Sequence, residues 1–253
     1  MNLIVDAHVH LPVIDGLLTL EEKRERLLQD MEKDNIDRCV VISDSELESC
    51  IGSMEDCIRL FAGDKAVSVV CGISPLIDYS AQLERLQRHI AAGEASGIKL
   101  FPGHEGFYLS DSRLHPVWKL AEEYHVPVLF HSGWDNSFYA SPDEVRTVME
   151  AHPAVKLVCC HCFYPDLQEC MQMTDIPGLI FDLSSIADEP KTTNKLIPYL
   201  RELINRIPDR VMFGSDYASC ERMPHLQMME RLELPAEIRR KVMSENALSL
   251  YFR

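Results

Sequence analysis

Short apolar runs rich in β-branched residues alternate along the chain with longer amphipathic segments. Runs of this length are typical of buried strands, and apolar residues spaced three and four apart are typical of helices packed on a core. The pattern predicts eight strands, at Leu3–His10, Cys39–Asp44, Ala66–Ser74, Gly97–Phe101, Pro127–Gly133, Lys156–Cys162, Gly178–Ser184 and Arg210–Tyr217.

The amphipathic segments predict helices outside the sheet. They cover Thr19–Asn35, Tyr79–Ala92, Asp111–His125, Ser141–Ala151 and Lys191–Arg206, and Pro224–Arg231 and Pro235–Leu250 follow the last strand. Ser141 precedes a proline and two acids, which is typical of a helix start, and Asp111 is expected to cap the fourth helix in the same way. Repeated strand–helix units imply parallel strands with right-handed crossovers. Eight units in 253 residues predict a single α/β domain over residues 1–253, a (β/α)8 TIM barrel.

Histidines stand at the end of the first predicted strand, where a barrel has its open mouth. Successive side chains of a strand point to opposite faces. We therefore expect His8 and His10 to point into the barrel and Ala7 and Val9 to face the helices. Asp6 shares the face of His8 but lies deeper, where it could support the histidines by a hydrogen bond or serve only in packing.

The same alternation turns His131, at the end of the fifth strand, and Asp216, at the end of the eighth, toward the barrel axis. A single histidine at the end of a strand is more often a hydrogen-bonded core residue than a metal ligand. Taken alone, His161 would therefore be interpreted as a core residue. Three imidazoles and a carboxylate at one mouth, however, predict a divalent metal site. The expected ligands are His8, His10, His131 and Asp216.

Lys99 in the fourth strand is expected to point into the barrel as well. A buried ammonium must be paired or change its pKa. We expect an ion pair with Asp182 or Asp216 in preference to a carbamylated lysine that bridges two metals, and therefore one metal ion rather than two.

Nine cysteines are an odd number, and several lie inside apolar runs, as buried thiols do. Cys159, Cys160 and Cys162 surround His161 like a zinc knuckle. If His161 points inward, alternation sends Cys160 and Cys162 to the helix layer, so these groups cannot surround one ion. Free thiols and a start without a secretory leader pattern favour a cytoplasmic protein.

Charge and hydropathy exclude other classes of function. The chain carries 40 acidic and 25 basic residues, a net charge of -15, and the basic residues form no stripe. A nucleic-acid backbone would be repelled by most of this surface. No apolar run approaches the ~20 residues needed to cross a bilayer. The expected partner is a small-molecule substrate, with no nucleic acid and no membrane, and a homodimer is a possible assembly.

Together these motifs resemble the amidohydrolase superfamily, in particular the amidohydrolase-related branch of metal-dependent hydrolases and ACMS-type decarboxylases. The resemblance covers nearly the whole chain and rests on DAHVH, GIKLFPG, PVLFHSG, the histidine in CCHC, FGSDY and the terminal SENALSLY. It implies a mononuclear site, usually with zinc. It also implies that His161 lies beside the metal as a catalytic proton-transfer residue.

The chemistry of such a site suggests a role for each residue. Asp216 could touch the metal, accept the proton of an attacking water and deliver it to the leaving group. His161 could orient that water or stabilise an oxyanion. Specificity is expected in the loops Pro102–Arg113, Trp134–Ala140, Ile186–Asn194 and Ala218–His225, and Lys99, Trp134 and Arg222 are expected to contact substrate, Arg222 through a carboxylate.

Three functions remain open at the level of sequence. The first is a metal-dependent hydrolase of an amide, ester or lactone of a small molecule. The second is a metal-dependent, non-oxidative decarboxylase of a small carboxylic acid. The third is a ligand-binding barrel without catalysis, since a fold does not fix a function. The set of histidines and aspartate favours an enzyme, and zinc is the expected ion.

Overall fold

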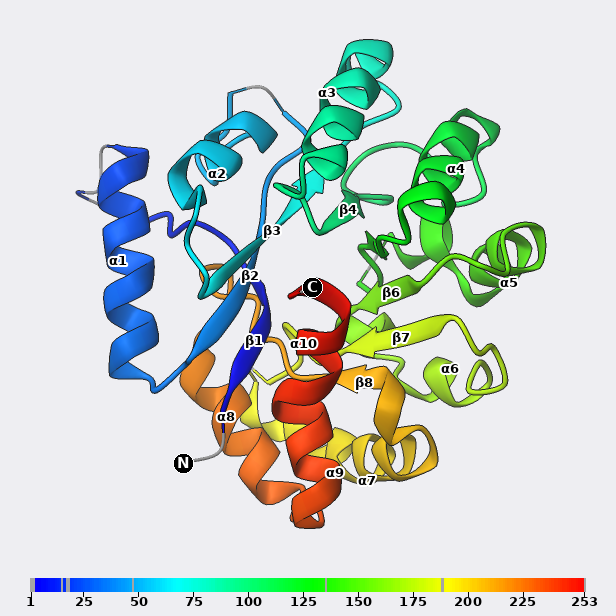
Figure 1. Ribbon diagram of the computed structural model, residues 1–253. Coiled ribbons are helices and arrows are strands. Elements are labelled where there is room, and N and C mark those ends of the chain that lie inside the picture. The colour runs from blue at the N-terminus through cyan, green and yellow to red at the C-terminus, as the bar shows by residue number, and fades with distance from the viewer. Residues whose placement is uncertain are drawn as a thin grey trace.

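The computed structural model describes residues 3–14, 16, 19–46, 48–134, 136–187 and 189–252. Eight parallel strands follow one another around a barrel in chain order (Figure 1). They are β1 (Val5–Val9), β2 (Arg38–Ile42), β3 (Val67–Gly72), β4 (Gly97–Leu100), β5 (Val128–Phe130), β6 (Leu157–Cys160), β7 (Leu179–Asp182) and β8 (Val211–Met212). Backbone hydrogen bonds from Ala7 to Phe213 (3.0 Å) and from Asp216 to His8 (2.9 Å) close the ring between β8 and β1. The predicted (β/α)8 barrel is confirmed.

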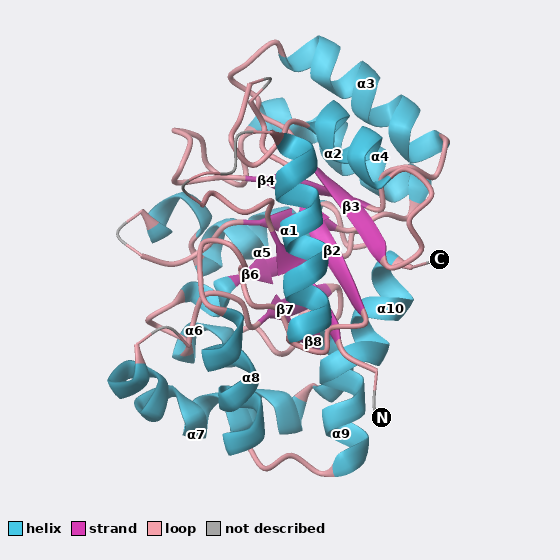
Figure 2. Ribbon diagram, turned by 90° about the vertical axis from the view of Figure 1, so that its left-hand side faces the viewer, coloured by secondary structure: helices cyan, strands magenta, loops and turns pink. Residues whose placement is uncertain are grey.

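Helices surround the strands, and long loops gather at the end of the barrel opposite the two termini (Figure 2). The helices are α1 (Leu20–Lys33), α2 (Met54–Phe61), α3 (Tyr79–Ala91), α4 (His115–Tyr124), α5 (Pro142–Ala151), α6 (Gln168–Met171), α7 (Pro190–Arg206), α8 (Arg222–Arg231), α9 (Ala236–Arg240) and α10 (Asn246–Tyr251). The hydroxyl of Ser141 accepts a hydrogen bond from the Glu144 amide, as a capping residue does. The segments of α2 and α6 were not among the predicted helices. None of the described helices is both long and apolar enough to span a membrane.

One end of the barrel is closed by the C-terminal helix α10, which lies in front of the strands in Figure 1. Its residues Ala247, Leu250 and Tyr251 belong to the apolar cluster that fills the barrel interior. Ser68 Oγ in β3 lies 2.8 Å from the backbone oxygen of Tyr251. A larger cluster packs between the barrel and the surrounding helices. A site inside the barrel must therefore open at the other end, where the strands finish.

The side chains of β1 depart from strict alternation. The register between β1 and β2 shifts between Asp6 and Val9, as at a β-bulge. Ala7 consequently belongs to the interior cluster, whereas Val9 belongs to the outer one. The prediction that Ala7 faces the helices was wrong, although the prediction for Val9 is confirmed. Asp6 was also misplaced, because it accepts hydrogen bonds from Ser215 (2.6 Å) and from Arg222 of α8.

Alternation breaks again at the end of β6. Cys160 is the last residue of the strand and belongs to the interior cluster, whereas Cys159 and Cys162 belong to the outer one. His161 follows with a φ of 65°, in the left-handed region, so it does not continue the strand. The prediction that Cys160 points to the helix layer was wrong for this reason. The thiols still lie on different sides of the barrel wall, so they form no zinc knuckle.

Arg222 links three elements beneath the surface instead of binding substrate. Its side chain is 2% exposed, and it donates to Asp6 Oδ2 (2.8 Å) and to Asp34 Oδ2 (2.9 Å). Its guanidinium also lies 4.3 Å from the centre of the Tyr217 ring. Its Nε and Nη1 atoms thus hold β1, the end of α1 and the start of α8 together. The predicted role of Arg222 as a carboxylate anchor for substrate was wrong.

Replacing Arg222 with alanine should destabilise the protein by about 3–5 kcal/mol, because two buried carboxylates would lose their cation. Urea unfolding measures this change. As a control, Arg206→Ala removes an exposed pair with Glu202 on α7 and should cost less than about 1 kcal/mol. Equal unfolding midpoints for the two variants would contradict the structural role of Arg222.

Candidate metal centre

Two histidines and an aspartate converge at the open end of the barrel. His8 and His10 come from the end of β1, and Asp216 follows β8. Asp216 Oδ1 lies 3.5 Å from His8 Nε2 and 3.3 Å from His10 Nε2. Within the described part of the chain, these three buried residues form a group in which one ligand atom of each lies within 4.8 Å of the others. Such a set of nitrogen and oxygen atoms suits a divalent metal ion.

The other ring nitrogen of each histidine is held by an acceptor. His8 Nδ1 lies 2.5 Å from Asp182 Oδ2 at the end of β7, and His10 Nδ1 lies 2.9 Å from the backbone oxygen of Ile42. Carboxylate and carbonyl oxygens accept hydrogen bonds, so each Nδ1 donates. In a neutral ring this arrangement leaves the Nε2 lone pair, which faces Asp216, available to a cation. Hydrogen bonds of this kind orient metal-binding histidines in proteins.

The charges of the group also call for a cation. Burial disfavours the charged form of His8, but the neighbouring Asp182 outweighs it and raises the pKa of His8 to about 9. Burial likewise opposes ionisation of Asp216, yet the hydrogen bond from His10 and the charge of His8 lower its pKa. The centre therefore keeps an ionised carboxylate and a positive charge side by side. A divalent cation would replace the proton on His8, as ligation requires.

His131 lies beside this group without being part of it. Its ring stacks on Trp134 at 5.4 Å, contacts His104 at 4.0 Å and meets His161 at 4.9 Å. Burial, followed by the charge of Lys99, lowers the pKa of His131 to about 2, so the ring is neutral and free to donate a lone pair. His131 points inward as expected, but its ligand atoms are not within the distance that joins the other three.

His161 is fixed on the floor of the site by Ser184. His161 Nδ1 lies 2.9 Å from Ser184 Oγ and 3.2 Å from the Ser184 backbone oxygen. Ser184 Oγ also lies 3.2 Å from His8 Nδ1 and so connects the two rings. Burial lowers the pKa of His161 well below its usual value. A neutral imidazole with Nδ1 engaged leaves Nε2 available to a water molecule or a substrate.

Lys99 points into the barrel, but its partner differs from the predicted one. Lys99 Nζ donates to Cys160 Sγ at 3.0 Å and lies 5.3 Å from the centre of the Phe101 ring. It forms an ion pair with neither Asp182 nor Asp216, so that prediction was wrong. The inward position of Cys160 explains the difference, because it puts a thiol where a carboxylate was expected.

Two residues of the centre were not identified as such from the sequence. Asp182 was considered only as a partner of Lys99, and Ser184 was given no role. Their position in the sequence could have identified both. They lie two residues apart at the end of β7, which is next to β8, and the closed ring brings β8 beside β1. An acid at that place can reach a histidine of β1.

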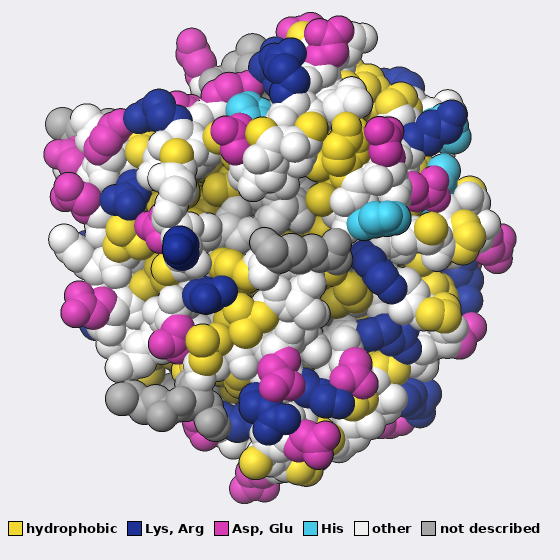
Figure 3. Space-filling model, in the orientation of Figure 1, with side chains coloured by type: hydrophobic (Ala, Val, Ile, Leu, Met, Phe, Trp, Pro, Cys, Tyr) yellow, Lys and Arg dark blue, Asp and Glu magenta, His cyan; other side chains and the backbone are white. Residues whose placement is uncertain are grey.

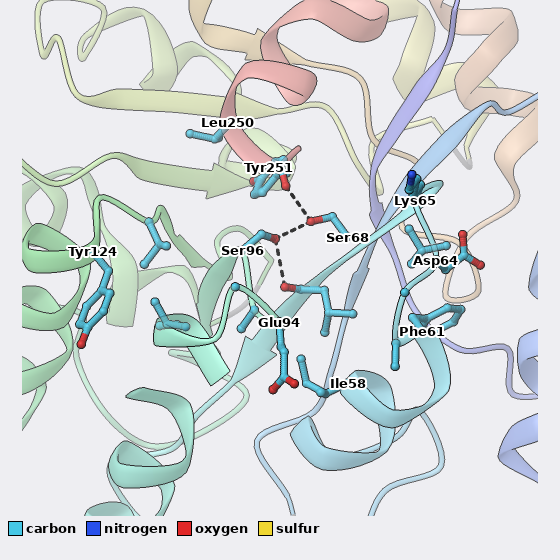
Figure 4. A pocket seen from close by; sticks show the side chains of 18 of the residues that line it. Ile58, Phe61, Asp64, Lys65, Ser68, Glu94, Ser96, Tyr124, Leu250 and Tyr251 are labelled. Carbon is cyan, nitrogen blue, oxygen red and sulfur yellow. Dashed lines mark hydrogen bonds between the residues drawn. The ribbon is translucent and has the colours of Figure 1, made fainter. Parts of the chain in front are cut away.

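A cavity lies at the opposite end of the barrel. It has a volume of about 540 Å³ and is lined by β3, the segment before β4, and α10. Ser68, Ser96 and Tyr251 meet on its wall, with Ser68 Oγ 2.7 Å from Ser96 Oγ (Figure 4). The two metal-binding groups found in the described residues both lie elsewhere. The candidate metal ligands therefore lie away from this cavity, and those of the centre lie at the mouth, where barrel enzymes have their active sites.

Comparison with known proteins agrees with this architecture. A family model described as amidohydrolase matches residues 5–253. The chain belongs to the amidohydrolase family. No curated protein matches it in sequence. The resemblance inferred from the sequence motifs is thus confirmed for the family.

Solved structures share the fold of this amidohydrolase at low sequence identity. An uncharacterized TIM-barrel protein from Bordetella bronchiseptica is 19% identical, with a TM-score of 0.79 over 98% of this chain and 97% of the other. Dihydroorotase from Campylobacter jejuni is 16% identical, with a TM-score of 0.65 over 98% and 82%. A dihydroxybenzoic acid decarboxylase from Polaromonas sp. JS666, with bound manganese and an inhibitor, is 13% identical, with a TM-score of 0.66 over 99% and 97%. Both hydrolases and decarboxylases therefore use this fold.

Gly214 in the β8 segment should be indispensable for the centre. A Cβ at this position would overlap Asp182 Oδ1 and come within 3.0 Å of His8 Cβ. We expect Gly214→Ala to weaken zinc binding by about 10- to 100-fold, the usual effect of disturbing a partner of a metal ligand. Gly106→Ala is the control, because a Cβ there meets only Tyr139 at 4.0 Å. Isothermal titration calorimetry with zinc measures the affinity of each variant. Equal zinc affinities for Gly214→Ala and Gly106→Ala would refute the proposed packing around His8.

Proposed function

We propose that this amidohydrolase is a metal-dependent hydrolase that cleaves an amide, ester or lactone bond of a small molecule. The convergence of His8 Nε2, His10 Nε2 and Asp216 Oδ1, with both Nδ1 atoms held by acceptors, carries the proposal. A barrel that only bound a ligand would not need an ionised carboxylate buried beside two oriented imidazoles.

His8, His10, Asp216 and His131 would hold one divalent ion, which we propose to be zinc. The donor set of three imidazoles and a carboxylate suits zinc, and manganese is the alternative ion, found in one structure of the same fold. When bound, such an ion would lower the pKa of a water molecule and polarise a carbonyl group.

Asp216 would move the proton of the reaction. Its carboxylate is ionised and lies at the mouth next to both histidines of β1. It would accept a proton from the water that attacks the carbonyl carbon and pass it to the departing nitrogen or oxygen as the bond breaks. The same residue would thus serve as general base and then as general acid.

His161 would orient the attacking water. Ser184 occupies its Nδ1, so the unprotonated Nε2 can accept a hydrogen bond from that water. Trp134 lies edge-on to the His161 ring at 5.2 Å and covers one side of it. We propose that Trp134 contacts substrate. Lys99 would act from inside the barrel, where its positive charge helps to lower the pKa of His131.

Decarboxylation is the alternative within the same site. The predicted anchor for a substrate carboxylate was Arg222, and that side chain is buried between Asp6 and Asp34. A decarboxylase must bind a substrate carboxylate, and the predicted anchor for it is not accessible, so we favour hydrolysis. Product analysis separates the two reactions, because a decarboxylase releases carbon dioxide and consumes no water in cleaving a bond.

Chelation should remove activity without unfolding the protein. We expect the chelated protein to lose turnover of small esters, amides or lactones and to regain it when zinc or manganese is restored, because the carbonyl would otherwise lack an electrophilic partner. Circular dichroism checks that the fold persists. Full turnover in a chelated sample free of metal by elemental analysis would contradict a metal-dependent mechanism.

Asp216→Asn should retain part of the metal and lose turnover by about 10²- to 10⁴-fold, the usual contribution of a positioned acid–base group. The amide can still offer an oxygen to the ion but cannot take a proton. The measurements are kcat and bound metal per chain. Turnover at the rate of the unaltered protein would refute the acid–base role.

His131→Ala should lower metal affinity more than about tenfold while the fold stays intact. His152→Ala is a matched control, since its ring packs on Trp118 at the outside of the barrel. Metal content after dialysis distinguishes the two variants. If both retained the same amount of metal, His131 would not be a ligand.

A further inference from the structure

The loop segments that follow the strands contain acidic residues but no lysine or arginine. Eight segments join the end of each strand to the next helix or turn, at residues 10–19, 43–53, 73–78, 101–111, 131–141, 161–167, 183–189 and 213–221. They contain thirteen Asp or Glu and no Lys or Arg, although the chain has 25 basic residues. The basic residues lie elsewhere, and Figure 3 shows many of them among acids on the end that α10 covers.

Several basic side chains next to these segments are committed to other contacts, but not all of them. Arg26, which donates to Asp30, and the exposed Lys33 line a pocket together with residues 217–223. Arg222 is buried between Asp6 and Asp34. Arg113 donates to both carboxylate oxygens of Asp111. Lys23 is buried and donates to the Cys50 backbone oxygen at 2.6 Å. Lys191 is exposed on the first turn of α7 and is tested separately below.

A further lysine lies inside the barrel and not at the rim. Lys99 is buried in β4, with its ammonium directed at Cys160. The loop segments therefore offer a substrate carboxylate no guanidinium of their own to bind it in the bidentate manner that proteins commonly use. Apart from histidine, their charged side chains are acidic.

Aromatic side chains form the apolar part of the same mouth. Trp134 is 40% exposed, Tyr108 47% and Phe138 50%. The Trp134 ring lies parallel to His131, with an angle of 13° between the planes, and Tyr108 contacts Phe138 at 6.4 Å. Exposed rings beside carboxylates are the means by which proteins recognise organic cations, through cation–π attraction.

From the acidic loops and the exposed rings we infer that the substrate is an organic cation: an amide, ester or lactone that carries an ammonium group on an apolar or aromatic body. The inference rests on the proposed hydrolysis and specifies its substrate class. The ammonium would lie against Trp134 and the acidic loops, while the carbonyl points to His8, His10 and Asp216. Acidic loops would also attract such a substrate from solution.

Binding of matched probes tests the charge preference without catalysis. Trp118→Phe leaves Trp134 as the only tryptophan of the chain, and Trp118 is buried in α4, where its ring packs on His152. Trp134 fluorescence in the chelated protein is then titrated with benzyltrimethylammonium, benzyl alcohol or phenylacetate. We expect the cation to bind at least tenfold more tightly than the anion, and the ratio to shrink between about 0.01 M and about 1 M salt, where screening becomes strong. Equal binding, or tighter binding of phenylacetate, overturns the inference.

Variants in which acidic side chains are replaced by amides show which part of the surface causes the preference for a cation. The mouth variant combines Glu46→Gln, Asp166→Asn and Glu221→Gln, which are exposed acids of three loops. The control combines Glu123→Gln, Glu150→Gln and Glu237→Gln, which removes the same charge from exposed positions of α4, α5 and α9. We expect the mouth variant to lose at least threefold of its affinity for benzyltrimethylammonium and the control to keep it. An equal loss in both overturns the inference. The inference is also overturned if the mouth variant binds phenylacetate more tightly than benzyltrimethylammonium and the additional substitution Lys191→Gln removes that preference.

A series of esters separates this inference from the proposed function. Three esters share one scissile bond and carry a trimethylammonium, a neutral or a carboxylate group at the far end. The inference predicts that kcat/KM follows that order. If the anionic ester is cleaved fastest, hydrolysis stands and the charge inference fails. If no ester is cleaved while the cationic probe still binds preferentially, the proposed reaction fails and the charge inference stands.

Discussion

The seam between β8 and β1 is the constraint on which the site depends. The amide of Asp216 donates to the backbone oxygen of His8, so closure of the barrel brings together residues from the two ends of the chain. That bond fixes where the carboxylate of Asp216 meets the imidazoles of β1. Asp182, on the strand next to β8, then orients His8, and Gly214 leaves space for the contact. Without the closed ring these groups would not share a point.

The sequence predicted the eight strands, their order and the inward side chains of β5 and β8, because alternation holds along regular strands. It failed where the backbone is irregular. A bulge in β1 turned Ala7 inward, and the left-handed residue His161 turned Cys160 inward. Neither irregularity has a marked signal in a single sequence, since both arise from packing between strands. Alternation alone therefore misplaced the partner of Lys99.

Arg222 shows a different limit of prediction. A basic residue just after the last strand looks like a substrate anchor when only its position is known. In the folded chain, Asp6 and Asp34 approach it from β1 and the end of α1, and these contacts join residues 216 and 188 positions apart in the sequence. Without Arg222 as a substrate anchor, the loop segments at the mouth contain acidic residues and no lysine or arginine. The fold is shared by hydrolases and decarboxylases, so these charges, more than the barrel, bear on which substrate is accepted.

The most direct measurement is a crystal structure of the protein grown with zinc, using anomalous diffraction at the zinc edge to locate the ion. Our account predicts one strong peak about 2.0–2.2 Å from His8 Nε2, His10 Nε2, an oxygen of Asp216 and a ring nitrogen of His131. A peak between His8, Cys160 and Asp182, the other group of close ligand atoms found in the described residues, would contradict it. So would a structure with zinc bound only at the protein surface.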